Sequence, residues 1–319
     1  MLCAVFLFSA AAFARPRQDR GNEGAVNVVT TVFPSYDFVR EIAGDKVNLR
    51  LLLPPGLESH SFEPTPRDII QIQNSDIFVY VGGESEAWVE RILDSIDSSS
   101  ARASSSRTGP RRVVSLMDMV EVVEEEIVEG MQEEDEEPGG EEEPEYDEHV
   151  WTSPRNAKLI VRALTETLCQ ADSANAAFYR ENAKNYEAKL EDLDAGFREA
   201  LAGAKRRTLI FGDRFPFRYF ADAYGLRYYA AFPGCSTETE CSAATLAFLI
   251  DKVRDEGIPV VFHIELSNEK IADAISESTG AKKLLFHACH NVSKQDMDRN
   301  VSYLELQRGN LERLREALY

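Results

Sequence analysis

The chain has 319 residues, 44% of them hydrophobic, and this length suffices for two compact units rather than one. Its formal net charge of −20 argues against a nucleic-acid partner, because phosphate backbones are bound by clustered Lys and Arg. A cation is the more natural ligand for such a chain.

The first residues form a short apolar run, MLCAVFLFSAAAFARP, which ends in Ala12-Phe13-Ala14, a small-x-small pattern typical of signal-peptide cleavage. We therefore expect residues 1–14 to be a secretory signal and the mature protein to be periplasmic or otherwise extracytoplasmic, with a membrane tether left open. A first strand or a membrane anchor is the rival interpretation. However, the run is shorter than the ~20 apolar residues that a spanning helix needs.

Short β-rich runs alternate with helical stretches from Val26 onward, which predicts an N-terminal α/β lobe over residues 25–170 with a parallel sheet and crossover helices. The expected strands are 26–33, 47–54, 77–82 and 113–116. The expected helices are 36–43, 67–74, 84–96 and 154 to about 169.

An acidic stretch within this lobe, residues 121–148, contains sixteen Asp and Glu residues, with Pro138-Gly139-Gly140 in its middle. Like charges at this density repel one another, and the composition predicts a disordered loop. The loop either gathers cations for a nearby site or serves as a solubilising spacer, and both interpretations stay open.

A proline-free stretch, residues 171–205, is rich in Ala, Glu, Lys, Leu and Arg and predicts one long linking helix. Residues 206–319 then repeat the α/β rhythm as a C-terminal lobe. Its expected strands are 207–213, 226–232, 259–266 and 282–288, and its expected helices are 217–224, 242–256, 268–279 and 304–318. The predicted fold class is α/β, with two lobes, each a parallel sheet flanked by helices, joined by a long rigid backbone helix.

Four cysteines remain once the signal is removed, and an even number suits an oxidising compartment. They are Cys169, Cys235, Cys241 and Cys289. Three pairings are open, of which we prefer a bond between Cys289 and Cys235 or Cys241, since all three lie beside predicted strand ends. Thiolate ligation of a metal is the rival interpretation.

The five histidines lie in predicted strands, at strand ends or in loops. His60 lies in PPGLESHSFEPTP, a stiff loop after the second strand, where open α/β sheets bind ligands. His149 ends the acidic stretch immediately before a capped helix. His287 and His290, in FHACHN, follow the last predicted strand of the second lobe. His263 lies inside VVFHIEL, where a position in the core or at a sheet edge is expected.

Three segments, PPGLESHSFEPTPRDI, DEHVWTSPRNAKLI and RYFADAYGL, resemble the solute-binding proteins of zinc and manganese ABC importers, the family of ZnuA-like and TroA-like proteins. The resemblance covers nearly the whole mature chain. It implies two lobes joined by a long helix, with metal held in the cleft between them and His60 and His149 as ligands from the N-terminal lobe. It also implies an ABC-type permease of the inner membrane as partner, and we expect a monomer.

The chain departs from this family where a third ligand, His or Glu, precedes the aromatic stretch FPFRYF, because Asp213-Arg214 stands there. Arginine cannot ligate a cation, since its guanidinium has no free acceptor. The family's fourth ligand, an Asp after the last strand, falls near FHACHN, and we therefore expect His290 to ligate the metal, with His287 second. Three carboxylates remain open as alternatives: Asp213, Glu240 and Glu265.

Three or four imidazoles make a nitrogen-rich site, which suits tetrahedral Zn²⁺, whereas Mn²⁺ prefers carboxylates and water. Zinc is therefore the expected ion. A secreted zinc hydrolase would use similar ligands, but the sequence contains no H-E-x-x-H and no G-x-S-x-G motif, and we expect no enzymatic activity. The other alternative is a secreted acidic metal buffer or adhesin whose Glu-rich loop binds ions weakly.

Overall fold

The computed structural model describes residues 24–100, 109–131, 145–236 and 240–319. The first half contains β1 (Val26–Thr30), α1 (Phe33–Ala43), β2 (Val47–Leu51), α2 (Pro66–Asn74), β3 (Ile77–Tyr80), η1 (Glu84–Glu86), α3 (Trp88–Ser100), β4 (Arg112–Ser115), η2 (Met117–Met119), η3 (Val150–Thr152) and α4 (Pro154–Ala171). The helices η4 (Ser173–Asn175) and α5 (Ala176–Ala202) follow. The second half contains β5 (Thr208–Phe215), α6 (Arg218–Tyr224), β6 (Arg227–Pro233), α7 (Ala243–Asp255), β7 (Val260–His263), α8 (Lys270–Thr279), β8 (Lys282–Leu285), α9 (Lys294–Asp298) and α10 (Tyr303–Leu318).

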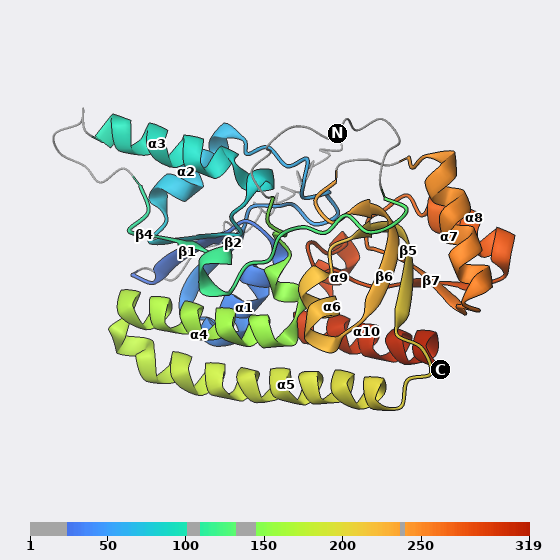
Figure 1. Ribbon diagram of the computed structural model, residues 1–319. Helices are drawn as coiled ribbons and strands as arrows, with labels where there is room; N and C mark the ends of the chain where they lie inside the picture. The colour runs from blue at the N-terminus through green and yellow to red at the C-terminus, as the bar shows by residue number, and fades with distance from the viewer. Residues whose placement is uncertain (1–23, 101–108, 132–144, 237–239) are drawn as a thin grey trace, which may run out of the picture.

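Each half is built on a four-stranded sheet, with strand order β2-β1-β3-β4 in the first and β6-β5-β7-β8 in the second (Figure 1). All strand pairs within the two sheets are parallel. Parallel strands are covered on both faces and therefore consist of nearly continuous apolar residues, as in Ile77–Tyr80. The predicted fold class of two α/β lobes is confirmed.

Helix α5 is the long helix expected between the lobes, and it runs beneath both of them (Figure 1). Its buried side chains recur at intervals of three and four residues, which places them along one face. They are Tyr179, Ala183, Tyr186, Leu190, Leu193 and Phe197. This face packs on α1 and α4 of the first half and on α10 of the second, so that one helix braces both halves.

The chain after β8 returns to the first half. The Phe33 N–H donates to the His290 carbonyl at 3.2 Å, and Trp151 Nε1 donates to the Ala288 carbonyl at 2.8 Å. The Tyr303 N–H donates to the buried carboxylate of Asp37 at 2.7 Å. Residues 288–303 are thus bonded to the N-terminal half although they follow the second sheet.

The described ends of the acidic stretch, residues 121–131 and 145–148, form what we call the acidic stem. Glu124 and Tyr146 form an antiparallel bridge, and the Asp147 N–H donates to the Val123 carbonyl at 3.0 Å. Tyr219 of α6 donates to the Asp147 carbonyl at 2.7 Å. The predicted disorder therefore does not extend to these ends, because their backbone groups are paired, while residues 132–144 lie outside the described residues.

The preferred disulfide between Cys289 and Cys235 or Cys241 is wrong, since all four cysteines of the described chain are free. Cys289 is buried, and its thiol faces α10, where Gln307 Nε2 lies 3.5 Å from Sγ. Cys235 and Cys241 are instead partly exposed. The predicted signal peptide lies outside the described residues, and among the described helices none is long and apolar enough to cross a membrane.

Candidate metal centre

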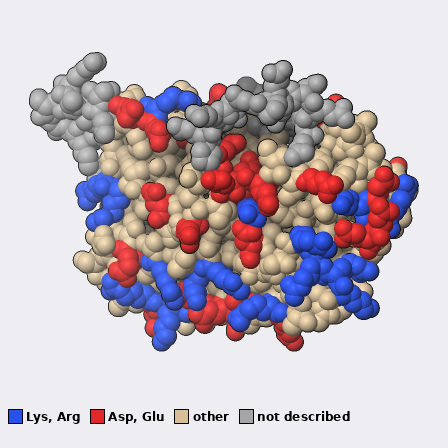
Figure 2. Space-filling model, viewed as in Figure 1, with Lys and Arg blue, Asp and Glu red and all other residues tan. Residues whose placement is uncertain are grey.

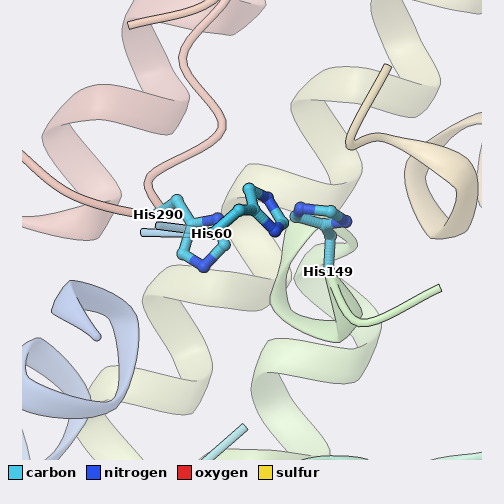
Figure 3. A group of neighbouring side chains, drawn as sticks. All are labelled: His60, His149 and His290. Carbon is cyan, nitrogen blue, oxygen red and sulfur yellow. The ribbon is translucent and has the colours of Figure 1, made fainter. Parts of the chain in front are cut away.

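Three imidazoles from distant parts of the sequence converge between the halves (Figure 3). His60 comes from the loop between β2 and α2, His149 immediately precedes η3, and His290 lies between β8 and α9. The ring centroids are 5.0 to 5.5 Å apart, and each ring offers a nitrogen within 4.8 Å of those of the other two. This is the arrangement of a three-nitrogen metal site.

His149 is fixed by a neighbouring carboxylate. Asp147 Oδ1 accepts the His149 backbone N–H at 2.8 Å and lies 3.2 Å from His149 Nδ1. Both residues are almost completely buried. Because Nδ1 faces an acceptor, it carries the proton, and Nε2 presents its lone pair. Nε2 is buried and has no hydrogen-bond partner among the described residues, as expected of a nitrogen that awaits a metal.

His60 lies in a tight turn. The Phe62 N–H donates to the Ser59 carbonyl at 3.0 Å, and the Ser61 N–H donates to Glu58 Oε2 at 3.1 Å, so these two bonds bracket the histidine. His60 Nδ1 is buried without a hydrogen-bond partner in the described structure. A second imidazole nitrogen is therefore available at the same site.

His290 follows a sharp backbone turn, in which Cys289 has the left-handed φ of 64°. The Cys289 N–H donates to His287 Nδ1 at 2.9 Å, which holds the turn. Glu265 Oε1 then accepts the His290 N–H at 3.0 Å. The backbone of His290 is thus held from both halves, by Glu265 and by the bond from Phe33.

Burial, followed by the charges of His149 and Arg214, holds the pKa of His60 well below its usual value of 6.5. Burial, followed by the charges of His60, His149 and Arg214, does the same to the pKa of His290. Burial also acts to lower the pKa of His149, but the carboxylates around it, Asp147 foremost, raise it overall. Burial therefore favours the neutral form of His60 and His290, whereas the carboxylates around His149 favour its protonated form, with which a metal would compete.

The pocket around the three rings is also lined by Glu58, Arg214 and Glu265. Arg214 projects from the end of β5, and its Nη1 donates to Glu58 Oε1 and to the Ser236 carbonyl, both at 3.1 Å. The guanidinium offers no lone pair, so this side of the pocket contributes charge rather than a ligand.

The other predicted candidates lie outside the three-histidine group. His287 is buried, with its Nδ1 engaged by Cys289. Asp213 accepts the N–H groups of Arg214 and Ile264, and both oxygens of Glu265 accept backbone N–H groups. Glu240 is exposed. His263 ends β7 with its Nδ1 3.1 Å from the Ile264 carbonyl, in keeping with the structural position expected for it.

Two residues with a role at this site were missed from the sequence. Asp147 stands two positions before His149, and a carboxylate at that spacing was the available signal, but it is one of sixteen acids in the stretch. Glu58 stands two positions before His60 in a loop whose hydrogen bonds the sequence does not display.

The family whose profile matches this chain is described as ZnuA, the periplasmic component A of the zinc-uptake complex, and the match spans residues 28–317. The chain belongs to the ZnuA family. It is 33% identical over 305 residues to the high-affinity zinc uptake system protein ZnuA of Bacillus subtilis, with 92% of this chain and 88% of that protein covered. It is 30% identical over 318 residues to the zinc-binding lipoprotein AdcA of Streptococcus pneumoniae, but spans only 59% of the length of AdcA.

Solved structures agree with this assignment. The metal-dependent lipoprotein YcdH of Bacillus subtilis matches with a TM-score of 0.74 at 30% identity, covering 92% of this chain and 100% of that one. Zn(II)-bound AdcA of Streptococcus pneumoniae matches with a TM-score of 0.72 at 28% identity, covering 92% of this chain and 58% of that one.

Membership in the ZnuA family confirms the predicted class of protein. The chain is a zinc-binding solute-binding protein of ABC import and not an enzyme. Members of the family are extracytoplasmic, and their partners are a zinc ion and an ABC importer. The histidine cluster gives this chain a set of donors that fits zinc.

Proposed function

We propose that His60, His149 and His290 together bind one Zn²⁺ ion, which this protein captures outside the cytoplasm and delivers to an ABC-type permease of the inner membrane. Zinc is the cargo of the protein, and the site holds it only for transfer. The protein acts as a monomer, reaches its compartment through the signal at residues 1–14, and comprises an N-terminal lobe (25–170), a linking helix (171–205) and a C-terminal lobe (206–319).

One observation carries this proposal. His149 Nε2 and His60 Nδ1 are buried without hydrogen-bond partners in the described structure, beside a third imidazole. A buried polar atom without a partner costs free energy, on the order of 1–3 kcal/mol. A divalent metal ion satisfies these nitrogen atoms at once, which explains why the fold keeps them unpaired.

The acidic stem fits the capture of a cation. It has four exposed glutamates in its first segment, at Glu121, Glu124, Glu126 and Glu129. Figure 2 shows acidic side chains gathered near the middle of the drawn face. A negative field at a surface raises the local concentration of cations and their rate of capture.

The experiment is to measure zinc per chain on the purified protein, and its affinity by competition with a chelator. We expect one tight site that is lost when His60, His149 or His290 is replaced by Ala. His263→Ala is the matched control, since it removes a partly buried histidine outside the cluster and should leave the site intact. Several weak sites that persist in the three alanine variants would instead favour the acidic buffer.

A further inference from the structure

The three histidines of the zinc site are not held equally. Asp147 fixes the ring of His149, and Glu265 and Phe33 fix the backbone of His290. The His60 loop is tied to the rest of the site up to Leu57, because Asn291 Nδ2 donates to the carbonyls of Pro54 and Leu57, both at 2.8 Å. Beyond Leu57, the next link across to the second half is the side chain of Glu58.

Glu58 joins both sides of the His60 turn to the second sheet. Its Oε2 accepts the Ser61 N–H beyond the histidine, and its Oε1 accepts from Arg214 at the end of β5. Arg214 is itself anchored through its bond to the Ser236 carbonyl, and its side chain is only 12% exposed. The position of the His60 turn therefore depends on Arg214 through the carboxylate of Glu58.

We propose that Arg214 and Glu58 form a latch that holds His60 in the pocket and sets how long zinc stays bound, with Arg214 acting as a positioning residue through Glu58. This inference rests on the proposed function. It gives a role to a residue that cannot ligate metal yet lines the metal pocket.

The opposite charges of Arg214 and Glu58 explain why both residues are needed beside a zinc ion. Among the described residues that line the pocket, Arg214 is the only Arg or Lys, and its charge repels a zinc ion held by neutral imidazoles. Glu58 cancels that charge while the pair is intact. The carboxylate of Glu265, the other acid in the lining, is occupied by two backbone N–H groups and stays in place.

The latch predicts unequal effects of two similar substitutions. Glu58→Gln weakens the pair and leaves the Arg214 charge facing zinc, so that zinc should dissociate about 10–100-fold faster, as is typical when a group supporting a metal ligand is lost. Arg214→Gln weakens the pair but leaves a free carboxylate near the ion, and its effect should be smaller. The double variant Glu58→Gln/Arg214→Gln should release zinc more slowly than Glu58→Gln alone.

The experiment loads each full-length variant with zinc and follows its release to an excess of a chromogenic chelator. Arg214→Lys keeps the charge and should release zinc at close to the wild-type rate. Glu187→Gln is the matched control, because it breaks an ion pair between α5 and Arg162 of α4, away from the pocket lining and from the acidic stem. Wild-type rates in Glu58→Gln, or a double variant in which the two effects multiply, would overturn the latch.

A second measurement tests the latch without zinc. Hydrogen exchange of the Ser61 amide in the metal-free protein should be faster in Arg214→Gln than in wild type, because that amide is bonded to the carboxylate that Arg214 holds. Unchanged exchange contradicts the latch. If the wild-type protein binds no zinc at all, the proposed function fails, whereas one tight zinc with unaltered release and exchange in the variants removes only the latch.

Discussion

Replacing Asp147 by Asn tests how the chain prepares its most buried ligand. The substitution keeps the shape of the side chain and one acceptor oxygen but removes the charge that faces His149 Nδ1. Hydrogen bonds to charged groups contribute about 1.5–3 kcal/mol, and every 1.4 kcal/mol is about tenfold in affinity. We therefore expect zinc affinity to fall about 10–100-fold, the range typical for groups that orient a metal-bound histidine.

A second effect of Asp147→Asn acts in the opposite direction and depends on pH. Asp147 is the foremost of the carboxylates that raise the pKa of His149, so the wild-type ring holds its proton more tightly. Above this pKa both proteins present a neutral ring, and the full loss is measured. Below this pKa, zinc must displace a proton from His149 of the wild type, whereas the same ring in Asp147→Asn has already lost its proton. The affinity of the wild type therefore falls faster than that of the variant, and the ratio of the two affinities should narrow by up to about tenfold per pH unit.

The assay is chelator competition at mildly alkaline and mildly acidic pH. Asp194→Asn is the matched control, since Asp194 is ion-paired to Arg155 on the helical side of the molecule and does not line the pocket. Equal affinities of Asp147→Asn and wild type at alkaline pH, or a difference that grows as the pH falls, would refute the reasoning.

Three further predictions concern the whole site. Between neutral and mildly acidic pH, the logarithm of the wild-type zinc affinity should fall by one per pH unit. The reason is that the pKa values of His60 and His290 are lowered, so that only a proton on His149 competes with zinc. Measuring the affinity across this pH range checks the slope, and a slope of two contradicts the prediction. His287→Ala should keep one zinc per chain but lower the free energy of unfolding by about 1–3 kcal/mol, because it removes a buried ring and its bond to Cys289. His290→Ala should instead lose zinc. Metal analysis and thermal unfolding distinguish the two variants. Deleting residues 132–144 should slow zinc association in low salt and have little effect in high salt, because salt screens the acidic charges that attract zinc. Stopped-flow association rates at the two salt concentrations test this prediction. A loss of equilibrium affinity at every salt concentration would mean that this segment contains ligands.

The sequence predicted the strands better than their ends. Apolar runs marked the eight strands of the described residues, but the predicted 47–54 strand ends at Leu51 in the structure, and the predicted 259–266 strand ends at His263. Leu52, Leu53 and Ile264 lie beyond these ends and are nevertheless buried. Their hydrophobicity reflects loops packed on the core, which a strand pattern cannot distinguish from strand.

Helix α9 was missed because it has only five residues and no buried ones. Its one sequence signal is Ser293, whose side chain caps the helix by accepting the Asp296 N–H. A periodic pattern needs more turns than this helix has. Short helices of this kind are defined by their caps and by the loops they join rather than by a hydrophobic face.

The grouping of the three histidines could be anticipated because His60 and His290 follow strands of the two sheets, where open α/β sheets bind ligands, and because two of the three stand in motifs of a known family. Their supporting groups could not be anticipated. Asp147 accepts from His149 two positions on, and Glu58 accepts from Ser61 three positions on, only because backbone turns bring these residues together. The sequence shows the acid but not the turn, and so it cannot distinguish a buried carboxylate from the exposed ones around it.

How far the two halves move on zinc binding depends on where His290 is held. The sequence suggested a ligand on each lobe, so that metal would join the two, but residues 288–303, which include His290, are hydrogen-bonded to the N-terminal half through groups that do not ligate metal. With α5 bracing both halves as well, the three segments of the site are linked by bonds that do not depend on zinc. We therefore expect small tilts rather than a wide closure, and X-ray scattering profiles with zinc and after chelation should nearly coincide. A large compaction on adding zinc would mean that these interlobe bonds break in the metal-free protein in solution.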